Sequence, residues 1–166
     1  MAEEIYVNIA GFNNYQVSNF GNVKNVKTGR ILKPSENRDG YFGVVLMNDG
    51  DRATKTIHKL IACAFLENFE NKPCIDHIDR NRKNNQISNL RWATLSENQH
   101  NKSMQQNNVS GIIGVSFCSG RNRWKSTIKI NGRNKTLGRF VNKEDAIRVR
   151  QEAEVLHFGE FRAIIN

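Results

Sequence analysis

The chain has 166 residues, a formal net charge of +9 at pH 7 and a pI of about 9.7. This positive charge favours a polyanionic partner such as nucleic acid. No apolar run is long enough for a transmembrane helix and no signal peptide is recognisable, so we expect an intracellular, cytoplasmic protein with no membrane partner. The three cysteines are widely spaced without a C-x-x-C pair, which indicates reduced, structural cysteines.

Residues 1–55 are rich in glycine, asparagine and β-formers and predict a small sheet of short strands. Residues 15–23 alternate apolar and polar side chains up to a turn at 19–22, and residues 40–46 form a second strand before a turn at 48–50. The basic residues of this segment fall mostly in or near turns, where they either contact phosphates or are simply solvated. The candidates for DNA binding are Lys24, Lys27 and Arg30.

Residues 56–102 begin with apolar side chains at helical spacing between 57 and 65, which predicts a short amphipathic helix. After Pro73, the pair Asp76-His77 lies on a predicted strand, and a polar loop from 79 to 86 follows. The cations of this loop are candidates for clamping DNA phosphates: Arg80, Arg82 and Lys83.

Residues 90–92 predict a short return strand. The next four residues, 94–97, have the form of a capping box, in which Thr94 and Glu97 each accept a bond from the other's backbone N–H. A helix is therefore expected to begin near Leu95, with Asn98 in its first turn.

This segment contains the groups that hydrolysis of a phosphodiester requires: an activated water, a cation and groups that hold the backbone. His77 is the candidate general base, because an imidazole is largely neutral at physiological pH and accepts a proton from water. The carboxylate of Asp76 and the amide oxygen of Asn98 are candidate metal ligands. Such hard oxygen donors suit Mg²⁺, with Mn²⁺ as a substitute, better than Zn²⁺.

Two side chains that follow each other on an extended strand point to opposite sides. A bulge or twist is therefore required if Asp76 and His77 are to face one phosphate. Asn89, at the end of the loop, is expected to tie the loop backbone together and to orient His77. Alone, an Asp-His pair is usually only hydrogen-bonded or solvated, but the order and spacing of these residues together favour an active site.

Residues 103–109 are polar without periodicity and predict a linker. Three strands are predicted at 112–117, 123–130 and 135–140, followed by a helix from about Asn142 to Gly159. Cations on this sheet and its turns favour a strand-based reader of the DNA major groove. For Trp124 the alternative is a core aromatic under the helix. The candidates are Arg121, Arg123, Trp124, Lys125, Lys129, Arg133, Lys135 and Arg139.

The stretches Asp76-His77-Ile78-Asp79, Asn89-Leu90-Arg91-Trp92 and Glu97-Asn98 resemble the ββα-metal motif (His-Me finger) of HNH nucleases, in the branch of phage-type and intron-encoded homing endonucleases. The resemblance implies that His77 and Asn89 are the catalytic residues, His77 as general base and Asn89 in a structural role. It implies that Asp76 and Asn98 bind the divalent metal. Many HNH enzymes have histidine where this chain has Asn98; His100 is the alternative, but it lies roughly 200° further around the helix.

The flanking segments carry resemblances of their own. Residues 5–65, with Tyr15 to Val23 and Ile57-His58-Lys59-Leu60, resemble the NUMOD4-type module that precedes HNH cores. Arg123-Trp124 and Leu137-Gly138-Arg139-Phe140 resemble an AP2/ERF-like DNA-binding domain. Together they imply an α+β protein whose parts are a β-rich NUMOD4-like module (1–55), the nuclease core (56–102), the linker (103–109) and an AP2-like domain (110–166) of three strands and one helix.

The expected function is a site-specific homing-type DNA endonuclease that acts on double-stranded DNA as a monomer, inside the host cell if a phage encodes it. Two alternatives are a non-catalytic, sequence-specific DNA-binding regulator with a degenerate core, and a non-specific nuclease. A regulator has no reason to keep Asp76, His77 and Asn98 together. A non-specific nuclease leaves the long C-terminal segment unexplained.

Overall fold

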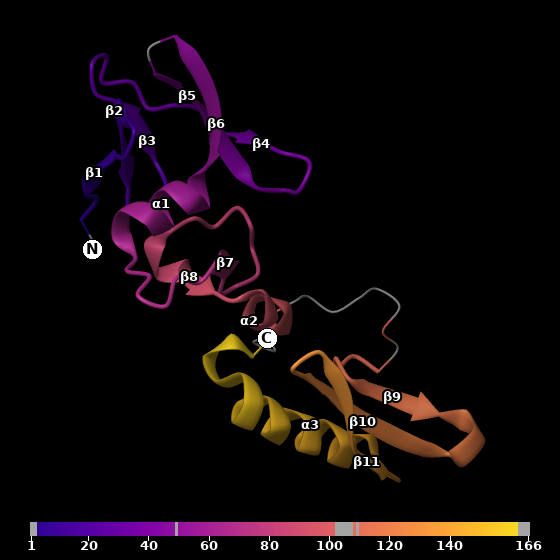
Figure 1. Cartoon of the computed structure of the whole chain (residues 1–166). Coiled ribbons are helices and arrows are strands. Elements are labelled where there is room, and N and C mark those ends of the chain that lie inside the picture. Colours follow the sequence, from indigo (N-terminus) through magenta and orange to yellow (C-terminus); the bar gives the residue numbers. More distant parts are fainter. Residues whose placement is uncertain (1–2, 49, 102–107, 109, 163–166) are drawn as a thin grey trace. The chain divides into compact units, whose positions relative to one another are not determined.

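The computed structural model is shown in Figure 1 and describes residues 3–48, 50–101, 108 and 110–162. The predicted linker, residues 103–109, lies outside this part except for Asn108. The chain divides into two compact units, residues 1–94 and 95–166. Both combine helices with antiparallel sheets, which confirms the predicted α+β class. Within the described residues, no helix has the length and apolar character needed to cross a membrane.

Two three-stranded antiparallel sheets make up most of the N-terminal unit. The turn predicted at 19–22 joins the second and third strands, where the backbone N–H of Ser18 donates to the carbonyl of Asn22 and Gly21 has a φ of +97°. The first sheet contains β1 (Tyr6–Ile9), β2 (Phe12–Ser18) and β3 (Val23–Asn25), and the second contains β4 (Ser35–Glu36), β5 (Phe42–Asn48) and β6 (Asp51–Thr56).

Helix α1 (Ile57–Phe65) follows β6 directly, as the apolar spacing predicts. Its residues Ile57 and Ile61 are buried in a core that also takes side chains from both sheets and Leu90 from further along the chain. Burial of such aliphatic side chains contributes roughly 1.5–3 kcal/mol each. The predicted segments 1–55 and 56–102 thus share one hydrophobic core up to residue 94, so the two sheets support the candidate site directly.

Strands β7 (Cys74–His77) and β8 (Leu90–Ala93) form a separate antiparallel pair, joined by a polar loop and the 3₁₀ turn η1 (Ile87–Asn89). Asp76 lies opposite Arg91 and His77 lies opposite Leu90, without a shift in register. The expected bulge at Asp76-His77 is therefore absent from these paired residues. No distortion is needed, because the two side chains find separate polar partners, Arg91 and Asn85.

The C-terminal unit contains the predicted three strands and long helix. Helix α2 (Leu95–His100) begins where the sequence predicts. The sheet has the order β11-β10-β9, with a left-handed Asn131-Gly132 turn between β10 and β11, and α3 packs on all three strands. The remaining elements are β9 (Val115–Cys118), η2 (Ser119–Arg121), β10 (Arg123–Ile130), β11 (Arg133–Phe140), α3 (Lys143–Phe158) and η3 (Gly159–Phe161).

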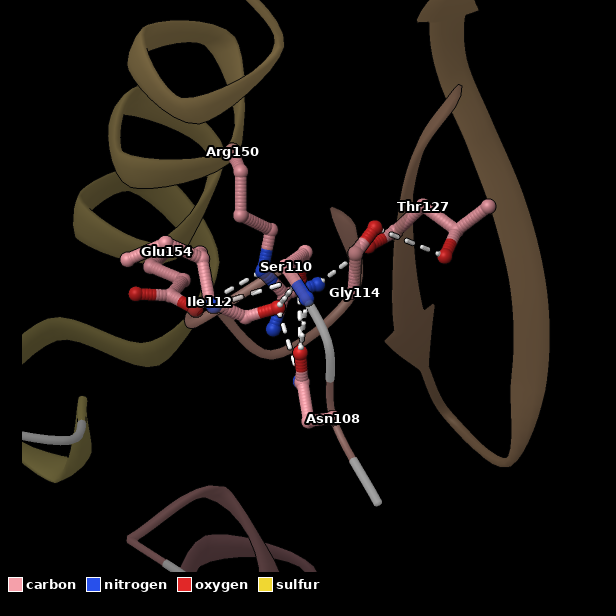
Figure 2. A network of polar contacts seen from close by, with 7 residues as sticks. All are labelled: Asn108, Ser110, Ile112, Gly114, Thr127, Arg150 and Glu154. Atoms are coloured by element: carbon pink, nitrogen blue, oxygen red, sulfur yellow. Dashed lines mark hydrogen bonds and ion pairs between the residues drawn. The ribbon is translucent and has the colours of Figure 1, made fainter. Parts of the chain in front are cut away.

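A polar network lies around the segment that precedes β9 (Figure 2). The Asn108 side chain accepts bonds from the backbone N–H and hydroxyl of Ser110 and donates to the carbonyl of Ile112 at 3.0 Å. These bonds turn the chain sharply before β9. Side chains make hydrogen bonds to the backbone atoms of this loop. These atoms therefore need no hydrogen-bond partner on a helix or strand.

Helix α3 supplies the other half of this network through a buried ion pair. Arg150 pairs with Glu154 at 2.7 Å, and Arg150 Nη1 also donates to the carbonyl of Thr127 on β10. The Thr127 backbone N–H and hydroxyl in turn donate to the carbonyl of Gly114. Only glycine fits at position 114, since a Cβ there would lie 2.4 Å from the Thr127 carbonyl oxygen. Figure 2 shows how Arg150 reaches from α3 towards Thr127.

Replacing Arg150 by methionine is expected to lower the free energy of unfolding by about 3–5 kcal/mol, because Glu154 is left as an unpaired charge in a buried site. The side chains of Arg150 and Glu154 are 6% and 12% exposed. Arg148→Met is the matched control: Arg148, on the same helix, is 65% exposed and pairs with exposed carboxylates, so its loss should cost at most about 1 kcal/mol. Urea unfolding measures both; equal effects would contradict the buried network.

Candidate active site

The loop between β7 and β8 is fixed by Asn89, which is buried at its end. The Asn89 amide donates to Asp79 Oδ1 and to the Asn84 carbonyl, each at 2.8 Å, and its oxygen accepts the Asp79 backbone N–H at 3.0 Å. Partial burial acts to raise the pKa of Asp79, but hydrogen bonds led by Asn84 outweigh it and lower the pKa. Asn89 therefore ties both ends of the loop to the strand pair.

His77 lies at the end of β7 with 5% of its surface exposed. Its Nε2 lies 3.1 Å from Oδ1 of Asn85, which is also buried. The ring is packed by two others: the centroid of Tyr41 is 5.9 Å away and that of His58, on α1, is 5.3 Å away. The β4–β5 connection, α1 and the β7–β8 loop thus all contribute to holding this imidazole.

Burial is the main cause that lowers the pKa of His77, and the Arg82 guanidinium lowers it further. The hydrogen bond with Asn85 and the nearby carboxylates act in the opposite direction without reversing the shift. A lowered pKa keeps the imidazole neutral at pH 7, which is the form that accepts a proton. His77 therefore has the protonation state that a general base needs.

His58 is a second buried histidine beside His77. Burial lowers its pKa to about 4, with smaller contributions from the charges of His77 and Lys59. Its Nδ1 has no hydrogen-bond partner within the described parts of the chain, and its ring centroid lies 4.7 Å from that of Tyr41. A neutral His58 adds no positive charge next to His77, so it does not oppose proton transfer to the candidate base.

Asp76, 4% exposed, makes a buried ion pair with Arg91 across the strand pair. Its Oδ2 accepts from Arg91 Nε at 2.9 Å and from Nη2 at 2.7 Å. This arrangement fixes the direction of the carboxylate. A cation bound by Asp76 would share the carboxylate with Arg91 or displace Arg91 from it.

Asn98 lies on α2 in the C-terminal unit and is partly buried. The structure brings Asp76, His77 and Asn89 together in the N-terminal unit, whereas the pairing of Asn98 with Asp76 remains a prediction. His100, the alternative ligand, stacks on Phe158 with ring centroids 3.7 Å apart. Its ring is engaged in the packing of the C-terminal unit, which favours Asn98 for the metal role.

The available donors fit a hard divalent cation better than a soft one. Asp76 offers a carboxylate and Asn98 an amide oxygen, and the described residues hold no group of three or more histidine, cysteine, aspartate or glutamate side chains arranged for a metal. Mg²⁺ commonly uses one or two carboxylates together with waters and substrate phosphates. The carboxylate and the amide oxygen are each hard donors of the kind that Mg²⁺ accepts.

Two of the three predicted phosphate-clamping cations of the loop hold the loop to the second sheet. Arg82 donates to the Asp39 carbonyl and lies over the Tyr41 ring, with 5.0 Å to the centroid. Lys83 pairs with Glu36 at 2.7 Å. Arg80 adopts a φ of +65° in the turn that follows β7. Arg82 and Lys83 both attach the loop to neighbouring parts of the N-terminal unit. Contact of the three cations with DNA remains a prediction.

Of the three cations predicted to bind DNA in residues 1–55, two lie in the turn after β3 and the third lies on β3 itself. Lys27 and Arg30 are exposed in the turn after β3, while the Lys24 ammonium lies 4.3 Å from the centroid of the Tyr6 ring. Positions 27 and 30 are therefore open to a phosphate backbone. Whether they contact DNA remains a prediction.

The C-terminal cations are divided between the two sides of their sheet. Lys125 lies opposite Arg139, on the side away from buried Ser126 and Ile128, whereas Lys135 lies opposite Ile128 itself. Arg133 lies opposite Ile130, next to the turn. These positions are exposed except for the half-buried Lys125: Arg121, Arg123, Lys125, Lys129, Arg133, Lys135 and Arg139.

Trp124 shares the side of β10 that carries Ser126 and is partly buried. Its ring centroid lies 5.1 Å from that of Phe117, and the ammonium of Lys143, the first residue of α3, lies 5.5 Å from it. This geometry favours the alternative in which Trp124 packs on the helix side of the sheet. A DNA contact by Trp124 remains a prediction.

Asn85 and Arg91 are the residues of this site that sequence reasoning missed. Arg91 becomes recognisable once β7 and β8 are paired antiparallel, because the register places it opposite Asp76. Asn85 is one of several asparagines in a polar loop, and no spacing rule distinguishes it. The prediction that Asn89 orients His77 is refined: Asn89 holds the loop, and Asn85 makes the direct contact.

Comparison with known families matches the two halves of the N-terminal region separately. Residues 4–46 match the model described as the NUMOD4 motif, and residues 56–100 match the model described as HNH endonuclease. The second match contains Asp76, His77, Asn89 and Asn98. The resemblances seen in the sequence for the module and the core are therefore supported by family models.

Curated relatives that match this chain are also described as endonucleases. The uncharacterized HNH endonuclease L247 of Acanthamoeba polyphaga mimivirus is 50% identical over 93 residues, which cover 54% of this chain and 23% of the relative. The DNA endonuclease I-HmuI of Bacillus phage SP01 is 41% identical over 88 residues, covering 53% of this chain and 51% of the relative. The chain thus spans about half or less of the length of these two relatives.

A solved structure described as "DNA binding and cleavage by the HNH homing endonuclease I-HmuI" matches with a TM-score of 0.57 and 28% sequence identity. This match covers 92% of the present chain and 89% of the other. The structural similarity is therefore not confined to the β7–β8 pair and its loop.

Proposed function

We propose that this chain is a DNA endonuclease of the HNH type that hydrolyses a phosphodiester with His77 as general base. The observation that carries the proposal is the buried, neutral His77, bonded to Asn85 and adjacent to Asp76, in the segment that matches the HNH endonuclease model. The similarity to I-HmuI, whose structure is described as one of DNA binding and cleavage, supports the same activity.

In the proposed reaction a water molecule attacks the phosphorus atom. His77 accepts a proton from this water while the new O–P bond forms. The P–O bond to the leaving sugar breaks with its electron pair on the sugar oxygen, which then takes up a proton. Asn89 acts indirectly, because it holds Asp79 and Asn84 and so fixes the loop next to His77.

Asp76 and Asn98 are the proposed ligands of a divalent cation, Mg²⁺ by preference with Mn²⁺ as a substitute. When bound, the cation supplies charge neutralisation at the scissile phosphate and the leaving oxygen. Arg91 contacts Oδ2 of Asp76, so a cation bound by this carboxylate would share it with Arg91 or displace Arg91.

We also propose that the enzyme is site-specific and of the homing type, with DNA held by both units. The N-terminal module supplies Lys27 and Arg30 at an exposed turn, and the AP2/ERF-like sheet of the C-terminal unit reads the major groove with its strand cations. A monomer has one such site and so cuts one strand. Binding of duplex DNA should weaken steeply with salt, because several cations face phosphates.

Incubation with supercoiled plasmid that carries a target site tests the activity. We expect conversion to the nicked circle with Mg²⁺ and no conversion with EDTA, and sequencing of the new ends gives the cut position. Tight, sequence-specific binding without any cleavage in Mg²⁺ or Mn²⁺ would contradict the proposal and favour the non-catalytic DNA-binding regulator.

A further inference from the structure

Asn85 contacts both His77 and the backbone of its own loop. Both residues are buried, with 6% and 5% of their surfaces exposed, and the Asn85 Oδ1 lies 3.1 Å from His77 Nε2. The other side-chain atom of Asn85, Nδ2, faces the Lys83 carbonyl at 3.4 Å. An amide nitrogen can only donate and a carbonyl can only accept, so this contact orients the amide with Oδ1 towards the histidine.

We propose that Asn85 is a positioning residue that fixes His77 in the tautomer with hydrogen on Nε2, which leaves Nδ1 as the basic nitrogen. The proposal rests on the proposed function, in which His77 is the general base. An amide oxygen carries no hydrogen, so the bond at 3.1 Å exists only if His77 Nε2 is the donor. In a neutral imidazole the other nitrogen then carries the lone pair, and that nitrogen takes the proton of the attacking water.

The loop around Asn85 is supported from two directions. Asn89 bonds to the carbonyl of Asn84, the residue just before Asn85, at 2.8 Å. From the first sheet, the Asn19 carbonyl accepts the backbone N–H of Ile87 at 3.0 Å. A Cβ on Gly21 would lie 3.4 Å from the Asn85 Cβ, so the turn between β2 and β3 packs directly against this side chain.

These contacts give the N-terminal sheet a part in positioning the base as well as in holding DNA. The tautomer of His77 depends on Asn85, and the placement of Asn85 depends on Asn89 and on the turn at Asn19 to Gly21. Residues that orient a metal-bound imidazole through its second nitrogen commonly affect activity by about 10–100-fold. The same size of effect is expected for Asn85.

The test uses the full-length protein and long-range ¹H–¹⁵N correlation spectra of the imidazole groups, which show which ring nitrogen carries hydrogen. The wild-type spectrum of His77 should show hydrogen on Nε2. In Asn85→Ala this preference should weaken or reverse, whereas Asn85→Asp, which keeps an acceptor oxygen at the same place, should retain it. If the wild-type spectrum shows the hydrogen of His77 on Nδ1, the proposal is wrong. No variant is needed for that conclusion.

Kinetics supply the second readout. Asn85→Ala should lower the single-turnover cleavage rate about 10–100-fold at unchanged DNA affinity, and Asn85→Asp should restore most of the rate. Equal loss in Asn85→Ala and Asn85→Asp would show a merely structural role and contradict the proposal. Absence of cleavage by the wild type with the expected tautomer would overturn the proposed function alone, so the two failures are distinguishable.

Discussion

His77→Ala is expected to lower the single-turnover rate of DNA cleavage by about 10²–10⁴-fold, the usual contribution of a general base. The affinity for duplex DNA should stay almost unchanged, because His77 is buried and the proposed phosphate contacts belong to other residues. The measurement is the cleavage rate with protein in excess over a target duplex in Mg²⁺, together with the dissociation constant of the same duplex in Ca²⁺ or EDTA.

His157→Ala is the matched control for this experiment, since His157 is an exposed histidine on α3. It should cleave at the wild-type rate. Equal cleavage by His77→Ala and wild type would show that another group activates the water. A loss of both cleavage and binding in His77→Ala would instead indicate a disrupted fold, which thermal unfolding of the same preparation would reveal.

Arg91→Met is expected to reduce the free energy of unfolding of the N-terminal unit by about 3–5 kcal/mol. The Arg91 and Asp76 side chains are only 14% and 5% exposed, so removal of the guanidinium leaves a carboxylate in a poorly solvated site. Urea unfolding followed by Trp92 fluorescence, in a Trp124→Phe background, reports on this unit, because Trp92 lies on β8 and donates to the Leu66 carbonyl.

Lys83→Met serves as the control for Arg91→Met. Lys83 pairs with Glu36 at the same 2.7 Å separation, but the two side chains are 50% and 46% exposed, so the expected cost is at most about 1 kcal/mol. If Asp76 binds a cation, Mg²⁺ should restore more stability to Arg91→Met than to Arg91→Met combined with Asp76→Asn. A change within about 1 kcal/mol for Arg91→Met would contradict a strong buried ion pair.

Local sequence signals were sufficient for most of the fold. The apolar spacing of Ile57 and Ile61 predicts α1, the Asn131-Gly132 turn predicts the β10–β11 hairpin, and Gly159 ends α3 as expected. Each of these signals acts within a few residues, so a single sequence reveals it. The shared core of the two N-terminal sheets and α1 depends on contacts between distant segments, and the predicted segments 1–55 and 56–102 gave no sign of it.

In the candidate site, too, some features follow from local sequence and others depend on contacts between distant residues. The order of Asp76, His77, Asn89 and Asn98 indicates the chemistry, because the type and spacing of these residues match what phosphodiester hydrolysis needs. The partners of Asp76 and His77 depend on the β7–β8 register and on the path of the polar loop, which no local pattern fixes. For this reason the sequence required a bulge or twist for Asp76 and His77 to face one phosphate, whereas the structure has an unshifted strand register with two separate side-chain partners.

The dependence of the cleavage rate on pH tests the central claim, that a neutral, buried His77 is the general base. Since burial lowers the pKa of His77, its basic form should predominate above pH 6.5 and be lost as the pH falls through the lowered value. Single-turnover rates in Mg²⁺ should therefore rise with pH below 6.5 and be constant from about pH 7 to 8. A rate that keeps rising tenfold per pH unit up to pH 8, with the same profile in His77→Ala, would contradict it.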